Sequence, residues 1–202
     1  MLVVPEEKYR EPNVEVQFPQ ASNYDLIIPL GAPWGAWDDD RIGAWLKPEL
    51  DFISEAIDAD VPIFGICFGG QLLARALGGS VAPGPKPEIG WTVVHTDRPD
   101  LVPAGPWFQF HYDRWQLPAE ALEIARNSAA SQAFTNGRNL GVQFHPELTP
   151  EMLLGWLNNG GRDLVIKDGQ DPDVLLAHTE AERDTAKERT NQLVDAFLRD
   201  VA

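Results

Sequence analysis

The chain has 202 residues, a single cysteine and a formal net charge of −15. This length suits one domain over residues 1–202 with a sizeable buried core, and a lone thiol cannot form an internal disulfide, which fits a reducing compartment. The acidic excess disfavours nucleic acid and membrane surfaces as partners, and no apolar run approaches the roughly 18 residues that span a bilayer. The first ten residues lack a signal-peptide pattern, so we expect a cytoplasmic protein.

The first third of the chain predicts short strands and a helix. Residues 13–18 alternate apolar and polar side chains, which indicates a strand near a sheet edge, and the apolar run at residues 24–30 indicates a second strand. Residues 31–37 form a turn-rich loop whose two tryptophans either cover the core or contact a substrate. Apolar residues recur at helical spacing over residues 42–59, where Pro48 is expected to divide the stretch or to begin a second helix.

An apolar run over residues 61–66 leads into Cys67 and then into the helical pattern of residues 71–77. A strand, a sharp turn and a helix hold a nucleophile in a strained, exposed position, where the helix dipole favours the thiolate. A lone cysteine is more often a small buried hydrophobic residue. The flanking glycines favour the nucleophile, because each costs about 0.5–1 kcal/mol relative to alanine in a regular element.

The second half of the chain predicts strands and then helices. A proline-rich loop spans residues 83–91, and strands are expected at 91–96, 107–112, 121–125, 131–134 and 140–144, the last three at hairpin spacings. Thr149 followed by Pro150 predicts a helix start. Residues 172–201 predict a helical tail with a solvated charged middle at 180–189. Its docking face comprises Leu175, Leu176, Leu193, Val194, Phe197 and Leu198.

A thiol nucleophile needs a base and a group that orients the base. His145 and Glu147 follow the strand predicted at residues 140–144 and are separated by one residue, which puts both side chains on one side of an extended segment. The carboxylate then accepts from one ring nitrogen while the other nitrogen faces the thiol. Together with a cysteine framed by glycines, this pattern predicts a triad of Cys67, His145 and Glu147.

These motifs resemble those of the class I, triad-type glutamine amidotransferases. Residues 65–71, Gly-Ile-Cys-Phe-Gly-Gly-Gln, are similar to the family's nucleophile elbow, and residues 143–147, Gln-Phe-His-Pro-Glu, to its His/Glu segment. Residues 87–91 and 110–113 resemble the substrate loops of the stand-alone, GMP-synthase-like members. The resemblance covers residues 24–152. It implies an α/β, flavodoxin-like fold, with a parallel sheet core flanked by helices and short antiparallel strands inserted.

The resemblance also implies a role for each matching residue. Cys67 would attack the side-chain carboxamide of glutamine, and His145, held by Glu147, would pass a proton to the departing ammonia and then activate water. The oxyanion would sit on backbone N–H groups of Phe68 and of the Gly31 and Ala32 turn. Gln71 is either a substrate contact or a hydrogen-bonding residue of the helix N-terminus, and we favour a structural role for His111. The expected substrate contacts are Gln71, Gly90, Trp91, His111 and Tyr112.

Three features depart from the family pattern. A Gly-Gly-Pro turn is usual where this chain has Gly31-Ala32-Pro33, so a backbone donor there requires that Ala32 tolerates the necessary φ. Tyr112 replaces a small residue and would reshape the pocket. Only about a dozen residues precede Asn13, too few for a crossover helix. Either the start lies downstream of the true one or the N-terminal strand and helix are shortened, and a homodimer would then cover the exposed sheet.

Three functions are consistent with these residues. The first is hydrolysis of the side-chain amide of glutamine through a cysteine thioester, with ammonia supplied to an acceptor on a synthetase partner. The second is a γ-glutamyl peptidase or hydrolase that uses the same thioester chemistry, and the third is a catalytically idle regulatory or binding subunit. The histidines and the thiol lack metal-ligand spacing, and residues 31–35 lack the Lys-Ser/Thr of a phosphate loop. We therefore expect no metal and no cofactor.

Overall fold

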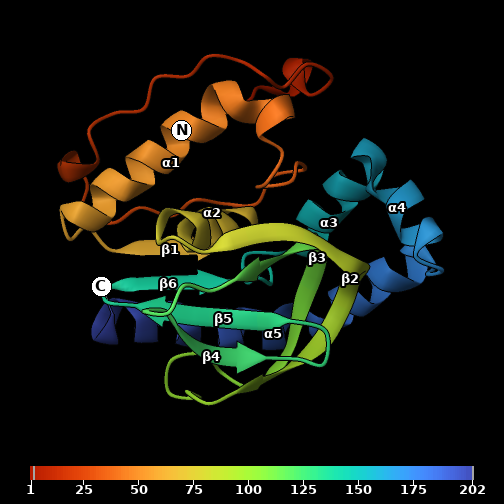
Figure 1. Cartoon of the computed structure of the whole chain (residues 1–202). Helices are drawn as coiled ribbons and strands as arrows, with labels where there is room; N and C mark the ends of the chain where they lie inside the picture. Colours follow the sequence, from red (N-terminus) through yellow and green to blue (C-terminus); the bar gives the residue numbers. More distant parts are fainter. Residues whose placement is uncertain (2, 202) are drawn as a thin grey trace.

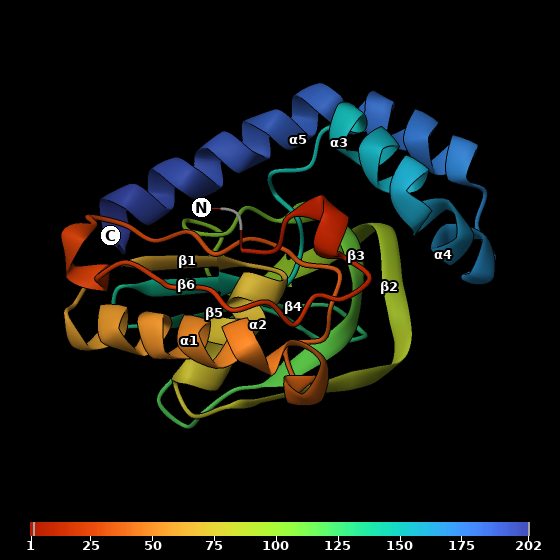
Figure 2. The same cartoon turned by 90° about the horizontal axis from the view of Figure 1, so that it is seen from above.

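The computed structural model describes Met1 and residues 3–201, which form a sheet with helices on both faces (Figures 1 and 2). The six strands lie in the order β1-β6-β5-β4-β2-β3. Among them β1 and β6 pair in parallel, whereas the other neighbours pair antiparallel. The predicted α/β class is confirmed, with a mixed sheet. The strands are β1 (Ile63–Ile66), β2 (Ser80–Thr96), β3 (Gly105–Gln116), β4 (Leu122–Arg126), β5 (Ser131–Asn136) and β6 (Asn139–Val142).

Helices cover the two faces of the sheet. Helices α1 (Asp39–Asp58) and α2 (Phe68–Ala76) lie on one face, and the long α5 (Pro172–Asp200) lies on the other (Figure 1). The strand β1 contributes Ile63 to the core under α1 and α2, and Phe64 and Ile66 to the core under Phe197 of α5. Because successive strand residues point to opposite faces, β1 is buried on both sides. The shorter elements are η1 (Glu6–Lys8), η2 (Ala21–Asn23), α3 (Pro150–Trp156), the π-helical η3 (Leu157–Gly161) and α4 (Arg162–Lys167).

The hairpins predicted from residue 121 onward are confirmed, because β4 pairs with β5 and β5 pairs with β6, both antiparallel. The strand predicted at residues 24–30 lies beside β1 but forms only an isolated parallel bridge, between Ile27 and Ile63. Its backbone bonds run from the Phe64 N–H to the Ile27 carbonyl, 2.9 Å, and from the Ile66 N–H to the Pro29 carbonyl, 2.9 Å. Pro29 has no N–H to return, which limits the ladder.

The strand predicted at residues 13–18 is wrong, since this segment has no regular structure. The chain ahead of α1 instead runs along that helix (Figures 1 and 2). Asn13 Oδ1 accepts from the Ala44 N–H at 2.8 Å, and the Pro12 carbonyl accepts from Trp45 Nε1 at 2.8 Å. Contacts to a helix therefore override the alternating pattern.

Two expectations about proline are also corrected. Pro48 lies inside a single 20-residue helix, α1, although an interior proline costs about 3 kcal/mol. The buried face that includes Trp45, Leu46 and Ile53 outweighs this cost. The proline-rich residues 83–87 belong to β2, where the pairing with β3 shifts register between Pro83 and Glu88. Unpaired strand positions are where proline is tolerated.

The predicted helix start at Thr149 is confirmed, because its Oγ1 accepts from the Met152 N–H at 3.2 Å. The helical tail is confirmed as α5, with Leu193 and Phe197 fully buried. The docking face was predicted too wide, since Leu198 is 51% exposed. The charged middle is not wholly solvated either, because Arg189 is buried and pairs with Glu182 at 3.0 Å.

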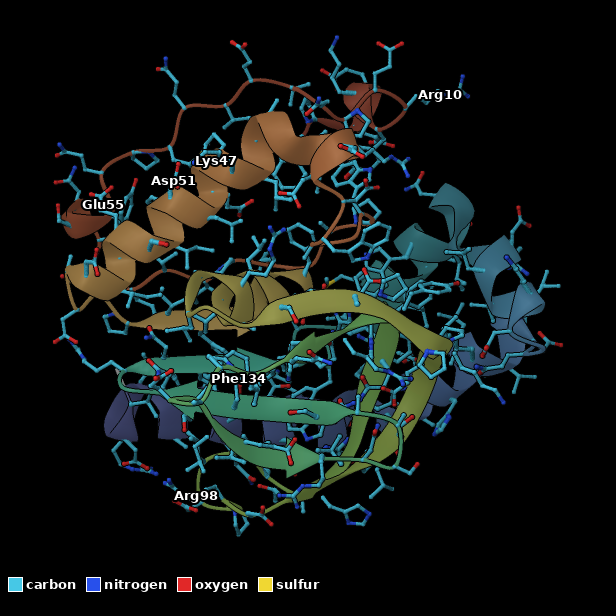
Figure 3. The ribbon with its side chains drawn as sticks, viewed as in Figure 1. Arg10, Lys47, Asp51, Glu55, Arg98 and Phe134 are labelled. Atoms are coloured by element: carbon cyan, nitrogen blue, oxygen red, sulfur yellow. The ribbon has the colours of Figure 1, made fainter. Side chains whose placement is uncertain are left out.

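Side chains on the two sides of α1 have different partners (Figure 3). Lys47 and Asp51 form an exposed ion pair one turn apart, with 3.1 Å between Nζ and Oδ2. Glu55 Oε1 accepts from the Ala21 N–H at 3.1 Å and so ties the N-terminal segment to the helix. Phe134, in the sheet, packs edge-on against Trp115 with 5.1 Å between ring centroids. Within the described residues, no helix is long and apolar enough to cross a membrane.

Helix α2 packs so closely on the segment before Gly31 that only glycine fits at residue 69. A Cβ on Gly69 would collide with the backbone carbonyl of Pro29, whereas a Cβ on Gly43 of α1 would meet nothing within 4 Å. We expect Gly69→Ala to lower the free energy of unfolding by about 1–3 kcal/mol through overpacking. The matched Gly43→Ala should raise it by about 0.5–1 kcal/mol. Urea denaturation measures both, and a Gly69→Ala variant as stable as the parent would contradict this packing.

Candidate active site

Cys67 joins β1 to α2 in a strained turn. Its backbone has φ 52° and ψ −108°, a conformation that costs a non-glycine residue on the order of 1–3 kcal/mol. Its N–H donates to the Val142 carbonyl of β6, 2.8 Å away. The strand, turn and helix appear where the sequence predicted them. The cysteine was expected to be exposed, but it is only 6% exposed and lies inside a closed site.

His145 and Glu147 come together just beyond β6. The imidazole Nδ1 and the carboxylate Oε1 are 2.8 Å apart, which is the contact that the spacing of the two residues predicted. The backbone N–H of His145 donates to the Phe108 carbonyl at 2.8 Å. The ring packs edge-on against Trp156, with 4.9 Å between centroids and 70° between planes. These contacts fix the ring, and its Nε2 is left for the thiol.

The charges around His145 favour its protonated form. Burial alone would lower the pKa of this imidazole, but the charges of Cys67 and Glu147, and hydrogen bonds to both, raise it to about 10. Glu147 Oε2 is buried, and within the described residues it has no hydrogen-bond partner. The carboxylate therefore acts mainly through the single contact to His145 and through its charge. An imidazolium between two anions is the expected resting state.

The turn at Gly31 packs against both reacting side chains. A Cβ on Gly31 would lie 3.0 Å from His145 Cε1 and 3.9 Å from Cys67 Cβ. In the described chain, only Asp60 and Cys67 are non-glycine residues with positive φ, so Ala32 sits in this turn without strain. The backbone N–H groups of Gly31, Ala32 and Phe68 donate to no acceptor among the described residues. All three are near the site in which an oxyanion was predicted.

Gln71 and Gln143 form a buried pair beside the thiol. Gln71 Nε2 donates to Gln143 Oε1 at 3.2 Å and to the Asp113 carbonyl at 3.4 Å. Gln143 Nε2 in turn donates to Cys67 Sγ at 3.8 Å. The predicted contact of Gln71 with substrate stays a prediction, and its Nε2 is already engaged by protein acceptors.

The remaining predicted substrate residues lie in different surroundings. His111 is buried and contacts Glu88 Oε2 at 3.1 Å and the Asp113 carbonyl at 3.0 Å, consistent with the structural role that we favoured. Gly90, at φ 98°, packs near Leu175 of α5, and Trp91 Nε1 donates to Thr179 Oγ1 of the same helix at 3.0 Å. Tyr112 is 39% exposed. Contact of these residues with a substrate remains a prediction.

The sequence reasoning did not assign a role to Gln143, Trp156 or Glu88. Gln143 precedes His145 by two residues, so strand alternation offered a signal that it shares a face with the imidazole. Trp156 reaches the ring from α3 and Glu88 reaches His111 from β2, and neither contact has a local sequence signal. Across the described residues, no cluster of three or more His, Cys, Asp or Glu side chains could hold a metal ion.

Comparison with known proteins relates this arrangement to one family. The sequence profile of Glutamine amidotransferase class-I matches residues 4–159. The glutamine-hydrolyzing subunit of the GMP synthase from Sulfurisphaera tokodaii is 33% identical over 165 residues, which are 73% of this chain and 82% of that protein. The longer glutamine-hydrolyzing GMP synthase of Mycobacterium marinum is 38% identical over 54% of this chain, which covers 22% of that protein.

Solved structures give the same result. A glutamine amidotransferase from Thermotoga maritima superposes with a TM-score of 0.82 at 28% identity, covering 95% of this chain and 85% of the other. A glutamine amido transferase from Methylobacillus flagellatus superposes with a TM-score of 0.75 at 26% identity, covering 85% of this chain and 75% of the other. The profile match and the Sulfurisphaera relative each cover most of the chain. The chain belongs to the class-I glutamine amidotransferase family.

Proposed function

We propose that Cys67, His145 and Glu147 hydrolyse the side-chain amide of glutamine and supply the ammonia to an acceptor held by a separate synthetase. The reaction itself follows from family membership. The observation that carries the assignment to these residues is the 2.8 Å contact between His145 Nδ1 and Glu147 Oε1, in a ring that packs against the same Gly31 turn as Cys67.

In the first half of the reaction, the Cys67 thiolate attacks the amide carbon of glutamine. The negative charge that develops on the amide oxygen is stabilised by the N–H groups of Phe68 and of the turn at Gly31 and Ala32. One such donor typically contributes a rate factor of about 10²–10³. His145 gives its proton to the leaving nitrogen, the carbon–nitrogen bond breaks, and ammonia departs from a γ-glutamyl thioester.

In the second half, the change in charge at Cys67 alters the behaviour of His145. The thioester sulfur carries no charge, so one of the causes that raise the pKa of the imidazole is absent in the acyl-enzyme. The neutral ring, oriented by Glu147, takes a proton from water while that water attacks the thioester. Glutamate then leaves and the thiolate returns. The same ring thus serves as acid first and as base second.

The destination of the ammonia is inferred from the relatives. The Sulfurisphaera protein is one subunit of a GMP synthase, and this chain covers 22% of the longer Mycobacterium marinum GMP synthase. We propose that the acceptor is activated by a protein other than this chain, as those names and lengths suggest. Glutamine is the expected substrate. Activity measurements decide between this function and the two alternatives, a γ-glutamyl peptidase and an idle subunit.

The first test is product release from glutamine and from a panel of other γ-glutamyl amides. The parent should release glutamate from glutamine, and Cys67→Ala should reduce the rate by a factor of about 10³ or more, because it removes the nucleophile. Glu120→Gln, a substitution at an exposed position, serves as a control and should keep the parental rate. Release from the other amides but not from glutamine would indicate a γ-glutamyl hydrolase. Unchanged turnover in Cys67→Ala would contradict the mechanism.

The second test is the titration of His145. In the parent the ring should stay an imidazolium until the pH approaches 10, because its pKa is raised to about 10 by the charges of Cys67 and Glu147. Removing the thiolate in Cys67→Ala, or the carboxylate charge in Glu147→Gln, should lower that pKa. Histidine-labelled NMR spectra follow the titration, and His145→Gln assigns the signal. A parental midpoint near the ordinary value of about 6.5, unchanged in Cys67→Ala, would argue against the coupled pair.

A further inference from the structure

A series of buried amide side chains ends on the sulfur of Cys67. Gln143 Nε2 donates to Sγ at 3.8 Å, and the Gln143 side chain is fully buried, so water does not compete for this contact. A hydrogen bond to the charged form of a group favours that form. The orientation of one amide therefore bears on how readily the sulfur exists as a thiolate.

The orientation of Gln143 is set by Gln71 and by a backbone carbonyl. Gln71 Nε2 contacts Gln143 Oε1 at 3.2 Å and the Asp113 carbonyl oxygen at 3.4 Å. A carbonyl oxygen only accepts, so Gln71 must present its NH₂ group at this point. Gln143 must then present its oxygen to Gln71 and its own NH₂ group to the sulfur. Flipping either amide would bring like groups face to face.

The Asp113 carbonyl is also the partner of His111. His111 Nδ1 lies 3.0 Å from that oxygen, and Nε2 lies 3.1 Å from Glu88 Oε2. Both partners only accept, so both ring nitrogens donate and the ring is charged. Burial would raise the pKa of Glu88, but the hydrogen bond and the charge of His111 outweigh it and hold that pKa below its ordinary value. The result is a buried ion pair at the far end of the amide series.

Glu88 is itself anchored by the opposite strands. Asn127 Nδ2 donates to Glu88 Oε1 at 2.5 Å, and Gln132 Nε2 donates to Oε2 at 3.2 Å. Gln109 completes the cluster through contacts with Gln132 at 2.9 Å and with His111 at 3.1 Å. A buried polar network that is satisfied throughout is held in one geometry. The network thus connects β2, β3 and β5 to the nucleophile.

We propose that the Glu88 and His111 pair is a positioning device for the nucleophile, acting through the Asp113 carbonyl, Gln71 and Gln143 to hold an N–H on the Cys67 sulfur. This rests on the proposed function, in which Cys67 attacks the amide. Stability does not explain the pair, because well-packed apolar residues often replace a buried ion pair without loss. A fixed geometry at the sulfur does explain it, and Gln143 rather than Glu88 makes the contact.

The test combines Gln143→Met, Glu88→Gln and the double variant in the full chain. Alkylation of Cys67 by iodoacetamide, measured as a function of pH, reports the thiolate without any need for glutamine. Gln143→Met should move the alkylation profile to higher pH by about half a unit or more. It should also lower kcat for glutamate release by a factor of about 10 and leave KM within about threefold. Glu88→Gln should act in the same direction.

The double variant decides whether Glu88 acts through Gln143. If it does, the double variant should have the kcat and the alkylation profile of Gln143→Met alone. Val94→Ala is the control for lost packing in the same strand, because Val94 is a fully buried apolar residue of β2. It should lower stability and leave both readouts at parental values.

Several outcomes would overturn the proposal. A folded Gln143→Met with parental kcat and a parental alkylation profile would remove the role of the amide. Effects of Glu88→Gln and Gln143→Met that multiply in the double variant would show that Glu88 acts by another route. If Glu88→Gln does not fold, Gln71→Met interrupts the series instead and should match Gln143→Met. A shifted profile in a parent that releases no glutamate would support the positioning device and refute the proposed function.

Discussion

The parallel pairing of β1 with β6 is the constraint on which the site depends. Parallel strands end at the same edge of a sheet, so the residues that follow them meet there. Ile66 pairs with Val142, and the next N–H, that of Cys67, closes on the Val142 carbonyl at 2.8 Å. His145 follows β6 by three residues. A slip of one residue would turn every side chain of a strand to the opposite face, which would separate thiol and imidazole.

A second consequence is that the reacting groups are enclosed. Cys67 and His145 are 6% and 5% exposed, and the turn at Gly31 packs on both. Buried charges are costly unless they are paired, and here the imidazole lies between the thiol and Glu147, with a pKa raised to about 10. The strained φ of Cys67 and this charge pairing store part of the stability that β1, β6 and α2 provide. The Gln143 amide adds a donor on the remaining side of the sulfur.

The features that the sequence predicted correctly are those with local causes. The turn at Cys67, the contact of His145 with Glu147 and the cap at Thr149 each depend on residues within a few positions of one another. Tertiary contacts decided the rest. The segment at residues 13–18 binds α1, a buried face carries Pro48 through α1, and Arg189 is buried beside Glu182. The Glu88 and His111 network joins residues from four elements, which no spacing in the sequence could indicate.

The most direct measurement on the Cys67 nucleophile is covalent labelling with a glutamine analogue that carries a diazoketone in place of the carboxamide. The thiolate should displace dinitrogen and form one thioether per chain, which peptide mass spectrometry should locate at Cys67. Excess glutamine should slow the labelling, because both ligands need the same site. Labelling at another residue, or a rate at Cys67 that saturating glutamine leaves unchanged, would contradict the assignment of Cys67 as the residue that attacks glutamine.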